Sequence, residues 1–296
     1  MKIVTIAVFI LASCTERIDI KTGDAPPRLV IYGHISTDKK QHSVRITRSA
    51  GFFTTDRPEG VSGALVTITD CDGKIIPLTE SEEEDEAGLY LTQPDECGVE
   101  TKTYRLDVVF KDNDGETKES YYAYAYLQDI HQIDSIDLRA SRFIRQTVEV
   151  LLYAHNFGED NNYAIFVSIN DSVVNSTLNR YFVINDSFFR GETYIDGVEC
   201  YFLSQNPDLE FRNEVLAIGD KVTLNINAIS AEYADFISSA QSQIRGSNPI
   251  FGGPPANVPT NINRGTPQYG APPLGFFTAF PSRYAHTIVK EDFIFN

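Results

Sequence analysis

Cys14 is the residue whose sequence context most clearly indicates a covalent reaction. A lysine near the start is followed by a compact apolar run from Ile3 to Ile10, and small residues stand directly before the cysteine. This order is typical of a secretory signal that ends at a lipid-attachment site, and the run is too short to cross a bilayer as a helix. We expect residues 1–13 to be a signal peptide that is cleaved before Cys14. Acyl chains on the thiol and amine of Cys14 would then hold the protein to a lipid bilayer. The alternative is an ordinary signal in which Cys14 has no role.

Three further cysteines could form disulfides in an exported protein. Cys71 and Cys97 lie in one candidate domain, on either side of two candidate strands. This placement is compatible with a bridge between them and equally with two free thiols. Cys200 would be left without a partner, and we expect it to be a small buried hydrophobic residue. No two cysteines have the spacing of a zinc site, so we expect no metal.

The histidines and serines show no catalytic pattern. No histidine pairs with another at the spacing of metal ligands on a helix, and the patterns His-Glu-x-x-His and Gly-x-Ser-x-Gly are absent. The chain also lacks a phosphate-binding loop and a dinucleotide-binding glycine pattern. A Ser-His-Asp triad is defined by geometry, so scattered residues cannot reveal one. We therefore expect a protein without catalytic residues or cofactors, with a hydrolase as the least favoured alternative.

The charge of the chain excludes one class of partner. The formal net charge is −16 at pH 7, and the phosphates of nucleic acid would repel such a surface, so we expect no nucleic acid partner. The same charge argues against adsorption of the protein as a whole to anionic lipid. Attachment to a membrane would therefore depend on the lipid anchor.

Two features could serve binding. Tyr122, Tyr124 and Tyr126 alternate along the chain, so a strand would place all three rings on one face, where they could stack on sugars or on a partner protein. The simpler explanation is that they pack at a domain junction. The second feature is the segment 246–275, which is rich in glycine and proline and contains no acid. Such a long loop either wraps a core or carries a binding site, for which Asn257 and Asn261 are the candidates.

The first half of the mature chain reads as a series of short strands. Residues 14–27 are polar, end in two prolines and resemble a tether. Seven short strands separated by turn residues then follow between Arg28 and Gln128. This pattern predicts a β-sandwich of the immunoglobulin-like or transthyretin-like kind over residues 28–128.

Residues 129–296 predict a second β-rich domain, joined to the first at about residues 129–137. One segment breaks the strand pattern, because apolar residues recur at steps of three and four after Ser230. We predict a helix over residues 231–245, with Ser230 as its N-cap. The expected fold is therefore all-β, with two domains, one helix and a long Pro/Gly-rich loop.

Several short segments in a fixed order resemble a known family. Besides the lipid-attachment site they are Pro27–Gly33, Val61–Val66, Asp72-Gly73, Asn248–Phe251, Pro254–Ile262 and Leu274–Phe277. Together they resemble the lipoproteins of Bacteroidota that contain the domain of unknown function 4249, over nearly the whole mature chain.

The resemblance implies an outer-membrane lipoprotein, on the surface or the periplasmic face, often encoded beside a TonB-dependent outer-membrane transporter. It transfers no catalytic residue. We expect an accessory binding component of a nutrient-uptake system, with a cell-surface adhesion or structural protein as the alternative.

Overall fold

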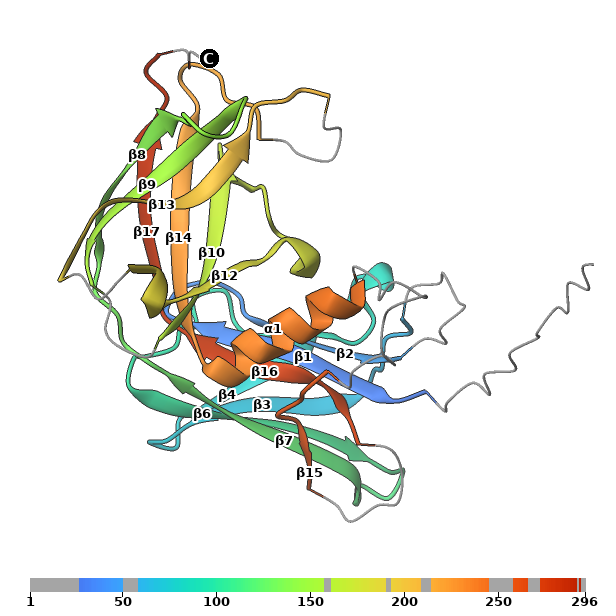
Figure 1. Ribbon diagram of the computed structural model, residues 1–296. Helices are drawn as coiled ribbons and strands as arrows, with labels where there is room; N and C mark the ends of the chain where they lie inside the picture. The colour runs from blue at the N-terminus through green and yellow to red at the C-terminus, as the bar shows by residue number, and fades with distance from the viewer. Residues whose placement is uncertain are drawn as a thin grey trace, which may run out of the picture.

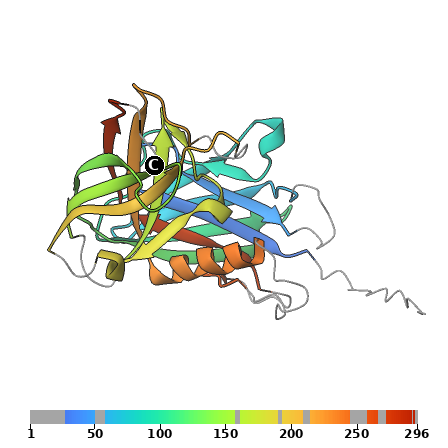
Figure 2. The ribbon, with the colours of Figure 1, turned by 45° about the horizontal axis from the view of Figure 1, so that its top comes forward.

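Two β-rich modules lie one above the other in Figure 1, and the one α-helix of the described residues crosses their junction (Figures 1 and 2). The computed structural model describes residues 27–49, 58–156, 161–189, 193–208, 214–244, 258–265, 272–291 and 293. Cys14 and the predicted signal peptide, residues 1–13, lie outside these residues. The described part of the chain is mostly β-strand, so the predicted all-β class with one helix is confirmed.

The N-terminal module is built on one nine-stranded sheet. In sheet order, its strands are β15 (Asn263–Arg264), β7 (Thr117–Leu127), β6 (Lys102–Lys111), β3 (Ala64–Asp70), β4 (Ile75–Glu80), β5 (Leu89–Leu91), β2 (Ser43–Arg48), β1 (Leu29–Ser36) and β16 (Leu274–Phe280). All seven strands predicted for the first half are present. A short 3-10 turn, η1 (Glu84–Glu86), precedes β5.

The sheet folds over on itself and encloses a core. β16, at one end of the strand order, lies beside β7 near the other end. Alternating residues of these strands point inward, which is what period-2 apolar patterns predict. The enclosed residues include Ile31, Ile46, Ile68, Leu106 and Phe277.

The pairing of β16 crosses the domain boundary that we predicted between residues 128 and 129. β16 comes from the C-terminal half of the chain, but it pairs in parallel with β1. Gly275 permits the close approach, because its φ is +100° and a Cβ there would lie 2.0 Å from the carbonyl oxygen of Ile31. The N-terminal module is therefore completed by residues that the sequence assigns to the second domain.

The C-terminal module contains two facing sheets. The larger has β11 (Ser172–Val173), β10 (Asn162–Ile169), β14 (Lys221–Ile229) and β17 (Ser282–Ile288) in that order, with β12 (Phe182–Asn185) also paired to β10. The smaller has β13 (Tyr194–Ser204), β9 (Thr147–His155) and β8 (Ile133–Ala140). The 3-10 turns η2 (Leu178–Arg180) and η3 (Asp186–Phe189) flank β12. β8 occupies much of the segment that the sequence suggested as a simple junction.

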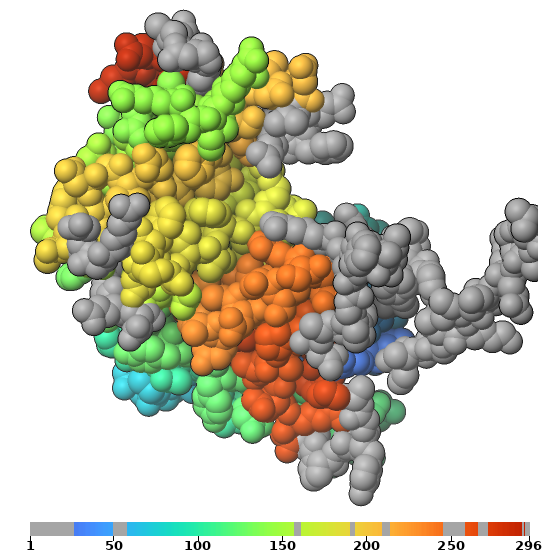
Figure 3. Space-filling view, viewed as in Figure 1, coloured from blue at the N-terminus to red at the C-terminus, as the bar shows by residue number. Residues whose placement is uncertain are grey.

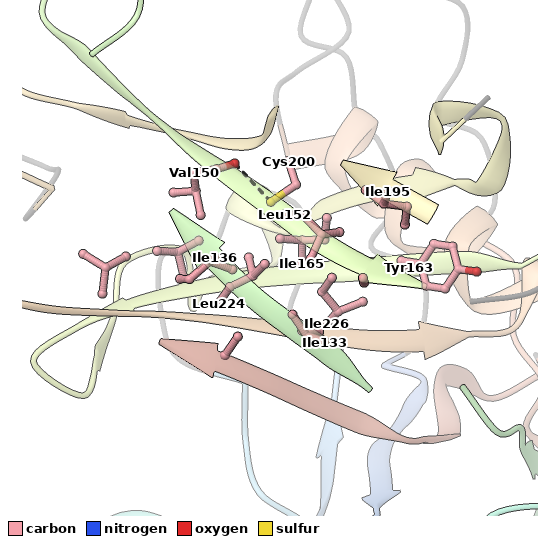
Figure 4. Close-up of a cluster of buried hydrophobic side chains, with 14 of the residues drawn as sticks. Ile133, Ile136, Val150, Leu152, Tyr163, Ile165, Ile195, Cys200, Leu224 and Ile226 are labelled. Carbon is pink, nitrogen blue, oxygen red and sulfur yellow. Dashed lines mark hydrogen bonds between the residues drawn. The ribbon is translucent and has the colours of Figure 1, made fainter. Parts of the chain in front are cut away.

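The core of this module lies between its two sheets (Figure 4). Cys200 is fully buried there, and its Sγ lies 3.3 Å from the carbonyl oxygen of Val150, to which the thiol donates. Burial raises the pKa of Cys200 to about 12, so the thiol stays protonated. The prediction that Cys200 is a small buried hydrophobic residue is confirmed.

The helix α1 (Ala231–Ile244) begins where the sequence predicts it. The Ser230 hydroxyl accepts a hydrogen bond from the backbone N–H of Tyr233 at 3.2 Å, which is the expected N-cap. Tyr233, Phe236 and Ile237 pack against Phe276 of β16 and Ala164 of β10. The helix thus joins the two modules through an apolar contact. No helix in the described ranges is both long and apolar enough to cross a membrane.

Candidate functional site: a cavity between the modules

A cavity of about 350 Å³ lies where the two modules meet. Its walls come from β1 and the β1–β2 loop on one side and from β10, β14 and β17 on the other, with α1 contributing Tyr233. The space-filling view shows the molecule notched between its two modules (Figure 3). The volume is at the lower end of the range for small-molecule sites.

Aromatic rings form one wall of the cavity. The hydroxyl groups of Tyr32 and Tyr233 are hydrogen-bonded at 2.5 Å, and Tyr181 belongs to the same cluster. Phe166 packs edge-on against Tyr181, with 4.8 Å between ring centroids. Burial raises the pKa of Tyr32, Tyr181 and Tyr233, so all three phenols are neutral at physiological pH.

His34 extends this wall without adding charge. Its ring stacks on Phe280 at 5.4 Å between centroids and meets His42 edge-on at 5.9 Å. Burial, together with the charge of His42 and Lys40, lowers the pKa of His34 to about 4. The imidazole is therefore neutral at physiological pH.

Asp38 and Lys40 line the cavity as an ion pair, with 2.9 Å between Nζ and Oδ2. The Tyr284 hydroxyl, from the other module, donates to the same carboxylate at 2.8 Å. Burial opposes ionisation of Asp38, but the hydrogen bonds from Lys40 and Tyr284 outweigh it and lower the pKa of the carboxyl. The two charges cancel, so the described lining of the cavity has no net charge.

Asn227 is the most informative polar residue of the cavity. It lies on β14 with only 5 % of its surface exposed, and it lines the cavity. Its Oδ1 is buried without a hydrogen-bond partner among the described residues. A buried acceptor without a partner costs about 1–3 kcal/mol, so a group that donates to this oxygen would recover that free energy.

Neighbouring contacts hold the two sides of the cavity in place. The backbone N–H of Ser282 donates to the Thr37 hydroxyl at 2.9 Å. Arg283 donates to the carbonyl oxygen of Ile130 at 2.7 Å and pairs with Glu100. These contacts link the two sides of the cavity, whose described lining combines aromatic faces, phenol hydroxyls and the unpaired acceptor of Asn227.

The three tyrosines predicted as a binding face are not in the cavity. They lie on the outer face of β7, where Tyr124 and Tyr126 are 51 % and 54 % exposed. The guanidinium carbon of Arg105 lies 5.2 Å from the ring centroid of Tyr122 and 5.6 Å from that of Tyr124. The simpler explanation, packing at a domain junction, is wrong for Tyr124 and Tyr126. Their role in binding stays a prediction.

Asn261 has a structural position. Its Nδ2 donates to the carbonyl oxygens of Tyr124 (3.2 Å) and Phe277 (2.7 Å), and its Oδ1 accepts from the Phe277 N–H at 2.9 Å. One side chain thus links β7 to β16 and closes the folded-over sheet. Asn257 lies outside the described residues.

The bridge considered between Cys71 and Cys97 is not formed, and both thiols are free. Cys71 is exposed in the β3–β4 turn, which the Asp70 carboxylate fixes by accepting the N–H groups of Asp72 and Lys74. Contact between this turn and the segment of Cys97 is made instead by Lys74, whose Nζ lies 2.7 Å from Glu96.

Sequence reasoning missed the residues that build the cavity. Asn225 and Asn227 share one face of a strand that is otherwise largely apolar, and this spacing was a signal that could have been used. His34 and Tyr32 gave no comparable signal, because their partners come from distant parts of the chain.

Together the fold and the cavity define an all-β protein of two modules, with a small cavity between them whose described lining has no net charge. The sequence profile of the family described as "Domain of unknown function (DUF4249)" matches residues 15–283, and the chain belongs to this family.

Other comparisons add little. Comparison with curated proteins finds no match. Among solved structures, the crystal structure of the chicken CNTN1 FN1–FN3 domains is similar with 12 % identity and a TM-score of 0.25, covering 69 % of this chain. The match covers 60 % of that structure. A TM-score this low does not define a shared fold.

Proposed function

We propose that this protein is a lipid-anchored binding protein that holds a small neutral ligand in the cavity between its modules. The observation that carries the proposal is the buried Oδ1 of Asn227, which has no hydrogen-bond partner in the described part of the chain and lines a cavity whose described lining has no net charge. Native proteins satisfy nearly all buried polar atoms, so such an exception needs an explanation. A ligand that donates to this oxygen supplies one.

The lining favours a particular class of ligand. Ionised ligands are disfavoured because His34 and the three phenols are neutral, while Asp38 is already paired with Lys40. The aromatic wall suits a ring with an apolar face, and Asn227 requires an O–H or N–H donor. A sugar ring combines both properties, so we assign a neutral saccharide as the ligand.

The anchor and the partner are part of the same proposal. The signal-like start and Cys14 support attachment of the protein to the outer membrane through acyl chains. Confinement to a membrane raises the effective concentration of the site near any membrane partner. We further propose an accessory role beside a TonB-dependent transporter, in which this protein presents the ligand for uptake.

Saccharide binding is tested on an array of neutral and acidic oligosaccharides. The full chain is compared with Asn227→Leu, which removes the unpaired oxygen, and with Tyr124→Ala, which alters only the exposed tyrosine face. We expect neutral saccharides to bind the wild type and Tyr124→Ala, and to be lost with Asn227→Leu. Absence of saccharide binding, or binding that survives Asn227→Leu, refutes the proposed site.

The partner requires a separate experiment. We expect a TonB-dependent transporter to be recovered with the native protein after extraction in mild detergent. Repeated recovery of the protein without any transporter argues against the accessory role but leaves the saccharide site untouched.

A second candidate function, adhesion, is favoured by the exposed face of Tyr122, Tyr124 and Tyr126 beside Arg105. Exposed aromatic rings next to a cation suit polysaccharide or protein surfaces. In the array, loss of binding with Tyr124→Ala and its retention with Asn227→Leu would select adhesion in place of the cavity.

A further inference from the structure

A second cavity, of about 540 Å³, lies at the end of the N-terminal module where the described chain begins. Pro27 and Arg28 line it, together with parts of β6, β7 and the segment before β3. It shares no lining residue with the cavity between the modules.

Basic residues dominate this cavity, although the protein as a whole is acidic. Its lining includes the cations Arg28, Arg48, Lys111, Lys118 and Arg264, and one carboxylate, Glu119. The formal net charge of the chain is −16. This local excess of positive charge is therefore opposite in sign to the rest of the molecule.

Three cations of this cavity, Arg28, Arg48 and Lys111, differ from basic residues elsewhere in the described chain. Lys102, Arg139 and Arg180 each pair with a carboxylate. In contrast, no ion pair is found for Arg28, Arg48 or Lys111 within the described ranges. The Nε of Arg28 donates to the carbonyl oxygen of Pro272 at 2.8 Å, which carries no formal charge.

The single carboxylate is already engaged. Glu119 accepts a hydrogen bond of 2.8 Å from the Tyr121 hydroxyl. Burial and this carboxylate raise the pKa of Tyr121 to about 12, so the phenol remains a donor. The guanidinium of Arg264 lies over the Tyr121 ring, 5.9 Å from its centroid. The cavity therefore combines a tyrosine wall with three cations, Arg28, Arg48 and Lys111, that can receive an anion.

We infer that this cavity binds the phosphate of an anionic lipid headgroup in the membrane to which the protein is anchored. Arginine and lysine are the side chains that bind phosphate oxygens best. Pro27 lies thirteen positions after Cys14, and a chain of that length reaches at most about 45 Å. The choice of a membrane lipid as the source rests on the proposed anchor; the binding of phosphate does not.

The consequence is a fixed orientation at the membrane. The anchored end of the N-terminal module would face the lipid surface, and the acidic remainder would be repelled from it. The net charge thus disfavours adsorption of the whole body, while the basic cavity permits contact at one end.

Vesicle binding of the full chain tests the inference. Cys14→Ser is introduced into the wild-type chain and into each variant. No acyl chain then contributes to vesicle binding, so the result is independent of the proposed anchor. Binding is measured to vesicles of phosphatidylcholine alone and of phosphatidylcholine with phosphatidylglycerol. The test variant is Arg48→Gln/Lys111→Gln, and the matched control is Arg142→Gln/Arg145→Gln, which removes the same charge from an exposed turn of the other module.

We expect preferential binding to the anionic vesicles, about thirtyfold weaker for the test variant and little changed for the control. Equal losses in both variants, or no preference for anionic vesicles, overturn the inference. A salt titration of the chain that carries only Cys14→Ser gives a second measurement, because binding through phosphate must weaken as ionic strength rises. Binding of inorganic phosphate without binding to anionic vesicles also overturns the assignment to lipid.

Discussion

Replacing Asn227 by leucine should stabilise the ligand-free protein while abolishing ligand binding. Leucine has nearly the shape of asparagine but lacks the buried oxygen that has no partner. Removing that desolvated acceptor should raise the free energy of unfolding by about 1–3 kcal/mol. For a protein of this size, each kcal/mol corresponds to a melting temperature shift of roughly 2–4 °C.

Asn175→Leu is the matched control, because Asn175 is also buried in the C-terminal module. Its Oδ1 accepts from the Val167 N–H at 3.1 Å, and its Nδ2 donates to the carbonyl oxygen of Ile165 at 2.9 Å. The substitution leaves both backbone groups buried and unpaired, so it should lower the free energy of unfolding by about 2–6 kcal/mol.

Chemical denaturation of both variants and the wild type measures these effects. The two substitutions are the same in chemistry and should change stability with opposite signs. A destabilisation by Asn227→Leu comparable to that by Asn175→Leu refutes the reasoning, because the oxygen of Asn227 would then have a partner in the empty protein.

Three further predictions concern the anchor, the sheet closure and a buried histidine. Cys14→Ser should abolish incorporation of labelled palmitate and release the protein from the membrane fraction; unchanged labelling contradicts the anchor. Asn261→Ala should lower the free energy of unfolding by about 2–4 kcal/mol, because three hydrogen bonds are lost, whereas Asn263→Ala should cost under about 1 kcal/mol; equal effects exclude the closure role. The low pKa of His34, about 4, means that the unfolded chain takes up the proton first as pH falls. His34 should therefore contribute up to about 3 kcal/mol to the free energy of unfolding above pH 6.5, and this contribution is lost towards pH 4. His34→Gln should flatten the pH dependence of the free energy of unfolding between pH 4 and pH 6.5.

Local patterns account for the elements that the sequence predicted well. The alternation in β6 and β7 needs only neighbouring residues to specify a strand. The helix is likewise specified locally, by Ser230 and the apolar stripe that follows it. Such patterns specify structure over a few neighbouring residues, so the folded protein keeps the elements that they predict.

The pairing of distant segments could not be predicted in the same way. Nothing in Leu274–Phe280 indicates that it pairs with Leu29–Ser36, because the register depends on the whole folded-over sheet. For the same reason Asn261 resembled a candidate ligand residue, although its side chain closes that sheet. Alternation placed the tyrosines of β7 together but did not tell which face is exposed.

The cavity between the modules depends on this long-range pairing. Tyr32 and His34 come from β1, while Asn227 comes from β14 and Tyr284 from β17. Their approach requires both modules to be folded and docked. The chemistry of the site was therefore present in the sequence, but its geometry was not.

A crystal structure of the protein with a saccharide that binds on the array is the most direct test of the proposed function. We predict a sugar ring against Tyr32 and Tyr233, with one hydroxyl donating to Oδ1 of Asn227. A saccharide bound only at the exposed tyrosines of β7, with the cavity between the modules free of sugar, would contradict the account.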